Sequence, residues 1–166
     1  MSDHKRGLDN LISESIYNRE LIEQFEAVLG KLNEKYVVFL LNYKVGEDWL
    51  DLEEDIEPFI FSPLHNENLN VEFMFTLPRV MARLHSYDLA FGLSAIHRKY
   101  KLLPFCSSGS SHLVYFIGRE SGYVYALNPN QDMELAINYQ ELNDRFLLYE
   151  DLNEFLSSIT LKHWEE

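Results

Sequence analysis

Residues 104–112, PFCSSGSSH, concentrate the side-chain types that could act as nucleophiles. A cysteine nucleophile needs a base within hydrogen-bond reach and a lowered thiol pKa, which a cation or a helix N-terminus can supply. His112 lies six residues after Cys106, the chain's only cysteine, but no helix start follows the cysteine and both flanks are typical of β-strands. We therefore expect Cys106 to be a buried thiol at the end of a strand, with a Cys106-dependent hydrolase as a minor alternative.

The four serines of this stretch surround Gly109 and do not form a known catalytic or phosphate-binding motif. A nucleophile elbow requires Gly-x-Ser-x-Gly, and a Walker phosphate loop requires Gly-Lys-Ser/Thr before a helix. Small polar residues around one glycine instead favour a turn stabilised by local side-chain hydrogen bonds. The stretch predicts a turn between two strands.

Metal-ligating and acid–base patterns are also missing from the sequence. The spacings Cys-x-x-Cys, His-x-x-x-His and Glu-x-x-His do not occur, and His85 with Asp88 supplies two potential ligands at most. Neighbouring carboxylates such as Glu53 and Glu54 belong to an exposed charged run, whereas a catalytic pair needs one member in an apolar setting. We expect no metal, no cofactor and no enzymatic role.

The strongest functional signal is residues 47–57, EDWLDLEEDIE, which we call the acidic strip. It carries seven carboxylates and no basic residue, and four apolar residues interrupt the charge. Protein interfaces favour an aromatic centre inside a polar rim, so an apolar anchor within this charge would suit a partner surface. In the alternative interpretation the strip is a solvated loop whose Trp49 and Leu52 turn into the core. The candidate partner-binding residues are Asp48, Trp49, Asp51, Glu53, Glu54, Asp55 and Glu57.

Length and composition predict one folded domain that binds neither nucleic acid nor membrane. The chain has 166 residues, 46% of them hydrophobic, and a net charge of −13 from 27 acidic and 14 basic residues. This charge repels phosphate backbones and attracts cationic partners. No apolar run is long enough to span a bilayer. A single cysteine forms no internal disulfide and the first residues lack a secretory signal, so a cytoplasmic location is expected.

The order of periodic segments predicts an α+β fold. Apolar residues at helical spacing predict helices over 13–29, from Asn33 onward, over 78–93 and near the C-terminus. Residues 71–76 alternate as in a strand, and 102–127 contain three aromatic or β-branched runs separated by turn residues. We expect an antiparallel (mixed) sheet meander packed with N-terminal helices and a C-terminal helix. Residues 133–138 and 145–149 are candidates for further strands. The domain is expected to cover 13–166, after an N-terminal extension of residues 1–12.

Three motifs, in this order, resemble the SUKH superfamily, which contains fungal cell-wall-synthesis regulators and bacterial toxin-immunity proteins. The first is the helix ending FEAVLG at 25–30, followed by Leu32 and by Tyr36-x-x-Phe39-Leu40. The second joins LPF at 103–105, a turn of small residues, LVYFI at 113–117 and GYVY at 122–125. The third is Asp151-Leu152-x-x-Phe155-Leu156. The sequence departs from the family pattern at Asn33, where a proline is usual, and at Asn42-Tyr43-Lys44, where Asn-Gly-Gly often stands.

The resemblance implies a non-enzymatic protein-binding domain. Its commonest small members are immunity proteins that neutralise a secreted polymorphic or contact-dependent toxin by binding it. Toxins of this kind are often basic nucleases, for which an acidic surface would imitate the displaced phosphates and steer association. The alternative that the family suggests is an intracellular scaffold or regulator with several weaker partners. The sequence leaves the oligomeric state open.

Overall fold

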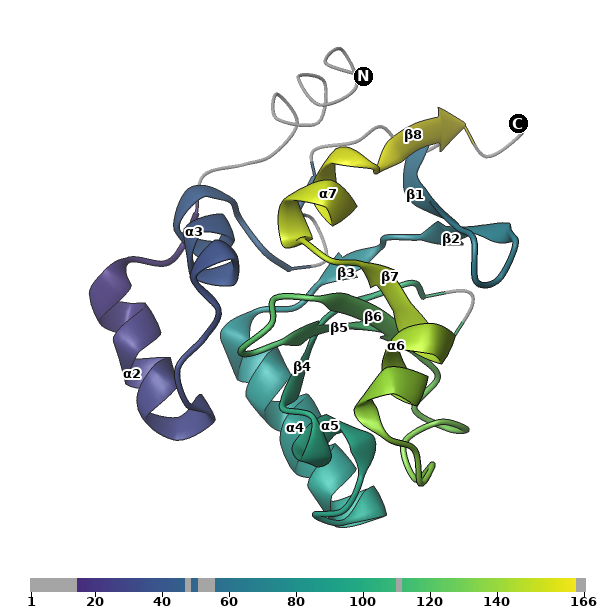
Figure 1. Ribbon diagram of the computed structural model, residues 1–166. Helices are drawn as coiled ribbons and strands as arrows, with labels where there is room; N and C mark the ends of the chain where they lie inside the picture. The colour runs from purple at the N-terminus through teal and green to yellow at the C-terminus, as the bar shows by residue number, and fades with distance from the viewer. Residues whose placement is uncertain (1–14, 47–48, 51–55, 110–111, 164–166) are drawn as a thin grey trace.

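The helices and strands of the chain follow the irregular order expected of an α+β domain (Figure 1). The structure is a computed structural model, which describes residues 15–46, 49–50, 56–109 and 112–163. Over these residues the chain forms six helices and two antiparallel sheets in a single domain. The predicted fold class is therefore confirmed. The predicted N-terminal extension, residues 1–12, lies outside the described residues.

Side-chain caps define where most helices begin. Asn33 Oδ1 accepts a hydrogen bond from the Lys35 amide at 3.0 Å, and Asn18, Thr76, Asn138 and Asp151 cap other helices in the same way. The first described helix starts after Asn18, whose cap fixes its first turn, and the predicted start near Ser13 lies outside the described residues. The helices are α2 (Arg19–Leu29), α3 (Glu34–Asn42), α4 (Leu77–Phe91), α5 (Ile96–Lys99), α6 (Tyr139–Phe146) and α7 (Leu152–Ser157). Among the described helices, none is long and apolar enough to cross a membrane.

The larger sheet contains the predicted meander. Its five strands have the order β3-β4-β5-β6-β7, and all pairs are antiparallel. Residues 145–149 supply its last strand in part, whereas residues 133–138 form no strand. The strands are β3 (Phe73–Met74), β4 (Leu102–Ser107), β5 (Val114–Gly118), β6 (Val124–Leu127) and β7 (Leu147–Tyr149).

A second sheet pairs segments from distant parts of the chain. It has the order β2-β1-β8, formed by β1 (Ile56–Ser62), β2 (Glu67–Asn70) and β8 (Thr160–His163). The sequence predicts a closing helix near the C-terminus, and α7 is present, but β8 follows it and pairs with β1. The Tyr115 hydroxyl of β5 donates a hydrogen bond to the Asn70 carbonyl at 2.6 Å, which ties the two sheets together.

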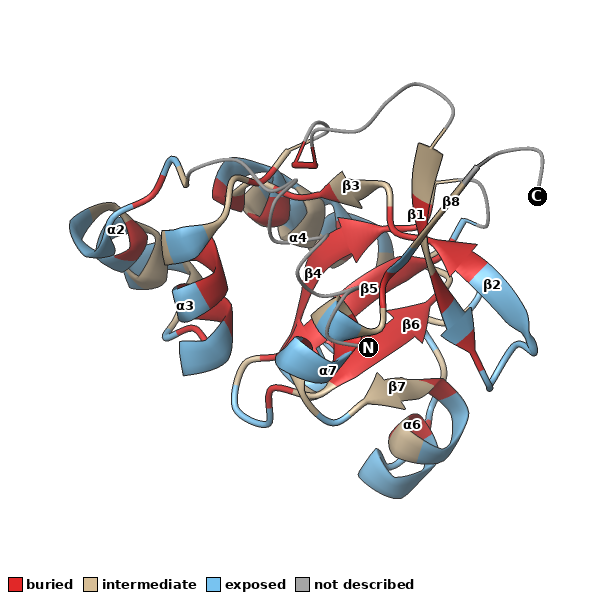
Figure 2. Cartoon of the chain, turned by 90° about the horizontal axis from the view of Figure 1, so that it is seen from above, coloured by how far each residue is buried: buried red, intermediate tan, exposed pale blue. Residues whose placement is uncertain are grey.

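Helices cover both faces of the five-stranded sheet, whose central strands are buried (Figures 1 and 2). On one face, Tyr87 of α4 packs on Phe116 with ring centroids 6.0 Å apart. On the other, Phe155 of α7 packs on Tyr115 at 5.2 Å and on Phe105 at 5.5 Å. Successive strand residues point to opposite faces, so the two aromatic sets form separate layers of the core.

Candidate functional site

The described residues of the acidic strip fix its position on the fold. The amide of Gly46, directly before the strip, donates a hydrogen bond to the Met74 carbonyl at 2.5 Å. At the other end, Ile56 opens β1 and pairs with His163 of β8. Five candidate residues, Asp48, Asp51, Glu53, Glu54 and Asp55, lie outside the described residues. The strip therefore runs between two fixed ends, one beside β3 and one in the three-stranded sheet.

Trp49 occupies the core. Its exposed fraction is 1%, and that of neighbouring Leu50 is 7%. A side chain buried this far offers no contact surface to a partner, so Trp49 does not serve as the exposed aromatic anchor of an interface in this structure. Its position matches the alternative interpretation, in which Trp49 turns inward and attaches the strip to the domain. Leu52, the other residue of that interpretation, lies outside the described residues.

Glu57 is the strip carboxylate whose surroundings are described. It is half-buried, and its Oε2 accepts a hydrogen bond from Asn70 Nδ2 at 2.9 Å across the β1–β2 pair. Burial raises the pKa of Glu72, and the charge of Glu57 raises that pKa further. Glu57, the last residue of the strip, therefore lies close enough to Glu72, directly before β3, for their negative charges to repel.

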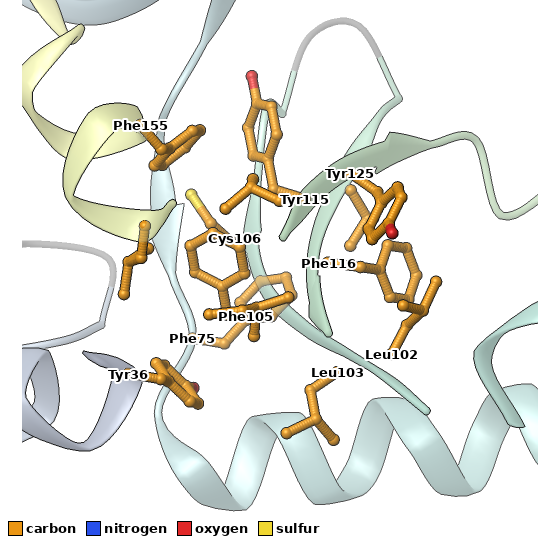
Figure 3. Packing of buried hydrophobic residues seen from close by; sticks show 14 of the residues in the cluster. Tyr36, Phe75, Leu102, Leu103, Phe105, Cys106, Tyr115, Phe116, Tyr125 and Phe155 are labelled. Carbon is orange, nitrogen blue, oxygen red and sulfur yellow. The ribbon is translucent and has the colours of Figure 1, made fainter. Parts of the chain in front are cut away.

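The thiol of Cys106 lies in the aromatic core, near the rings of Phe105, Tyr115 and Phe155 (Figure 3). The residue has no exposed surface, and burial raises the pKa of its thiol well above the usual value. Its Sγ lies 3.8 Å from the Ser107 carbonyl. A raised thiol pKa is the opposite of what a cysteine nucleophile needs, so this environment favours the expected packing role.

Cys106 and His112 also face different sides of the sheet. Cys106 stands opposite Tyr115 in the β4–β5 pair and shares its face. Ser107 stands opposite Val114, and both line a pocket on the other face together with His112. Because adjacent strand residues alternate between faces, the thiol points away from this pocket. The arrangement does not bring the thiol and the imidazole together as a catalytic pair.

The serine stretch does form the turn that the sequence predicts, since it joins β4 to β5 in an antiparallel hairpin. The hydroxyl of Ser108 donates to the Leu113 carbonyl at 3.1 Å, and Gly109 adopts a positive φ of 73°. This left-handed conformation is unstrained only for residues such as glycine. Ser110 and Ser111 lie outside the described residues.

Helix α4 and the described residues Ser107, Gly109 and His112 line a pocket of about 390 Å³, which we call the arginine pocket. Arg79, Arg83 and Tyr87 line one wall at successive four-residue steps along α4, and Ser107, Gly109 and His112 line the other. The sequence predictions do not include this site. One sequence feature could have predicted it: Arg79 and Arg83 lie on one helical face of a strongly acidic protein. Neither arginine has an acidic residue four positions before or after it.

A charged cluster links α4 to α5 beside Tyr87, and its own residues do not line the arginine pocket. Asp88 accepts hydrogen bonds from His97 Nε2 at 2.8 Å and from Arg98 Nε at 2.9 Å. The hydrogen bond from Arg98 is the largest cause that lowers the pKa of Asp88, to about 2, while burial lowers the pKa of His97. Asp88 is thus engaged by α5, and no group of three or more potential metal ligands occurs within the part of the chain that the structure describes.

No protein-family model matches this chain, and no curated protein matches it. The resemblance to the SUKH superfamily therefore depends on the order and spacing of its three sequence motifs, and membership stays a prediction.

Proposed function

We propose that this chain is a protein-binding domain that acts without catalysis, through the acidic strip, on a basic protein partner. In its most concrete form the chain is an immunity protein, and the partner is the toxin domain of a secreted bacterial protein. The SUKH resemblance suggests this role, and the charge distribution makes it physically reasonable. Masking a toxin's active site requires a complementary surface and no catalytic residue.

The observation that carries the proposal is the concentration of charge in a segment with anchored ends. The strip contains seven of the chain's 27 acidic residues and none of its 14 basic residues. Burial of Trp49 and Leu50, together with the pairing of Ile56 in β1, restricts where the strip can lie. Such anchoring reduces the conformational entropy that a binding segment loses on association.

The charge outside the described residues strengthens this interpretation. Eleven acidic and two basic residues lie there, which accounts for nine of the thirteen net negative charges. The positive and negative charges of the described residues are therefore close to balanced. An association steered by charge would depend mainly on the acidic strip and on the two ends of the chain.

The experiment is purification of the tagged chain from its native host at low and moderate salt. The proposal predicts a single basic protein in a one-to-one complex, encoded next to the chain and toxic when expressed without it. Several weakly bound partners of mixed charge would favour the scaffold or regulator alternative. Recovery of the chain without any stoichiometric partner under both conditions would count against a dedicated immunity role.

A further inference from the structure

Two guanidinium groups in the arginine pocket are placed against one aromatic ring. The Cζ atoms of Arg79 and Arg83 lie 5.9 and 4.7 Å from the ring centroid of Phe75. This ring is buried, and cation–π contact with it holds both guanidiniums beside the same side chain. Both arginines line the same pocket, so a bound anion would be attracted by two positive charges.

Neither guanidinium is neutralised by a described carboxylate. Arg83 Nη1 donates a long hydrogen bond of 3.5 Å to the Tyr87 hydroxyl, while no ion pair involves Arg79 or Arg83 over the described parts of the chain. By contrast, Arg98 on α5 pairs with Asp88, and Lys35 on α3 pairs with Asp151. Both guanidiniums keep donor groups available for a ligand.

The opposite wall is polar, and the one described acidic side chain beside it is Glu72, whose carboxylate lies next to Gly109 at the rim. This wall includes Ser107, Gly109 and the exposed His112, whose φ is also positive, at 62°. Leu113 and Pro129 add apolar surface to the same wall. Another polar pocket of similar size, lined by Lys101 and Arg119, also contains Glu34 and Glu120. The arginine pocket is thus cationic within a chain whose net charge is −13.

We propose that the arginine pocket binds a small organic anion, whose carboxylate or phosphate oxygens are held by Arg79 and Arg83. Planar guanidinium groups bind such oxyanions in a bidentate manner. The apolar part of the ligand would lie against Phe73, Leu113 and Pro129. The pocket volume of about 390 Å³ falls within the range of known small-molecule sites. This site is distinct from the acidic strip and independent of the proposed protein partner.

Glu72 provides a way to raise affinity without altering the arginines. A Cβ atom at Gly109 would lie 2.2 Å from a Glu72 carboxylate oxygen, which places this carboxylate against the rim of the pocket. Its negative charge opposes anion binding. Glu72→Gln removes that charge at nearly constant size, so it should tighten binding of the same anion.

The test is isothermal titration calorimetry with phenyl phosphate and with benzoate. The full chain should bind at least one of them saturably at millimolar concentration or below. Arg79→Gln/Arg83→Gln should weaken this binding at least roughly ten-fold, since two charge-assisted contacts are lost. Arg145→Gln is the matched control, because Arg145 also lies over an aromatic ring, Phe146 at 5.1 Å, but not in this pocket. Circular dichroism spectra check that each variant is folded.

The two probes also distinguish the natural source of the anion. Stronger binding of phenyl phosphate indicates a phosphate ester, and stronger binding of benzoate indicates a carboxylate; either supports the site. Tighter binding by Glu72→Gln supports it even if the double arginine variant does not fold. The proposal would be overturned if neither probe binds the full chain. It would also be overturned if Arg145→Gln weakens anion binding as much as Arg79→Gln/Arg83→Gln does.

Discussion

The sequence predicts the burial of Cys106, whereas it leaves the position of Trp49 open. The strand-like flanks of Cys106 correctly indicated a buried thiol, because continuous apolar runs on both sides are typical of a strand buried on both faces. Trp49 was ambiguous, since an aromatic residue among carboxylates suits both an interface and a core anchor. Its burial depends on contacts with distant elements, which local sequence does not encode.

At the residue scale, the thiol of Cys106 should be protected in the folded protein. Burial and the raised thiol pKa keep it protonated and inaccessible to Ellman's reagent at pH 8. Ser157→Cys, at an exposed position of α7, gives a control thiol that should react at least roughly 100-fold faster. In concentrated guanidinium chloride Cys106 should react fully. Rapid labelling of Cys106 in the native protein would reopen the hydrolase alternative.

His97 should make stability depend on pH near neutrality. Burial lowers its pKa in the folded state, so the unfolded chain binds more protons below the usual histidine pKa of about 6.5. The free energy of unfolding should therefore fall as pH decreases from 7.5 to 5.5. His97→Gln, which can still donate to Asp88, should reduce this dependence, whereas His85→Gln at an exposed site of α4 should not. Urea unfolding across this pH range measures the effect, and identical profiles for all three proteins would contradict it.

Asp88 adds a second transition at lower pH. Its pKa is lowered to about 2 by the hydrogen bond from Arg98, so its contribution to stability is complete above the usual aspartate pKa of about 4. That contribution is lost as pH falls from about 4 to 2. Asp88→Asn should remove the corresponding part of the acid transition. An unchanged acid transition in this variant would show that other carboxylates dominate it.

At the scale of elements, the sequence predicted local structure better than distant pairing. Helices α2, α3 and α4 carry apolar residues at helical spacing, and capping side chains precede them, so they were recognisable. The β4-β5-β6 meander was recognisable because its strands follow each other with short turns. The pairing of β1 with β8 was not, because its register depends on tertiary contacts between segments far apart in the chain. The arginine pocket was missed for the same reason.

Helix α7 should depend strongly on one aromatic side chain. Phe155 is fully buried and contacts the rings of Phe105, Tyr115 and Tyr149 at centroid distances of 5.5, 5.2 and 5.9 Å. Phe155→Ala should lower the free energy of unfolding by about 3–5 kcal/mol, from lost burial and the cavity left behind. Asn153→Ala on the exposed side of the helix should change it by less than about 1 kcal/mol. Equal effects of the two substitutions in denaturant titrations would show that α7 is peripheral to the core.

Across the whole molecule, charge is distributed unevenly. The described residues are nearly balanced, while most net negative charge lies in the acidic strip and at the two ends of the chain. The two proposed sites are opposite in charge. The negatively charged strip suits a basic protein, and the positively charged arginine pocket suits a small anion. The two sites share no described residue, so each proposal can fail without the other.

The most direct test of the protein-binding proposal is the association rate with the co-purified basic partner, measured by stopped-flow fluorescence over a range of ionic strength. Asp48→Lys/Glu54→Lys/Asp55→Lys changes the charge of the strip, and Glu23→Lys/Glu134→Lys/Asp144→Lys makes the same change in net charge at exposed positions elsewhere. We predict that the strip variant associates at least roughly ten-fold more slowly at low salt and with a weaker salt dependence, while the control variant changes much less. Equal rates for the strip variant, the control and the unmodified chain at low salt would contradict the account.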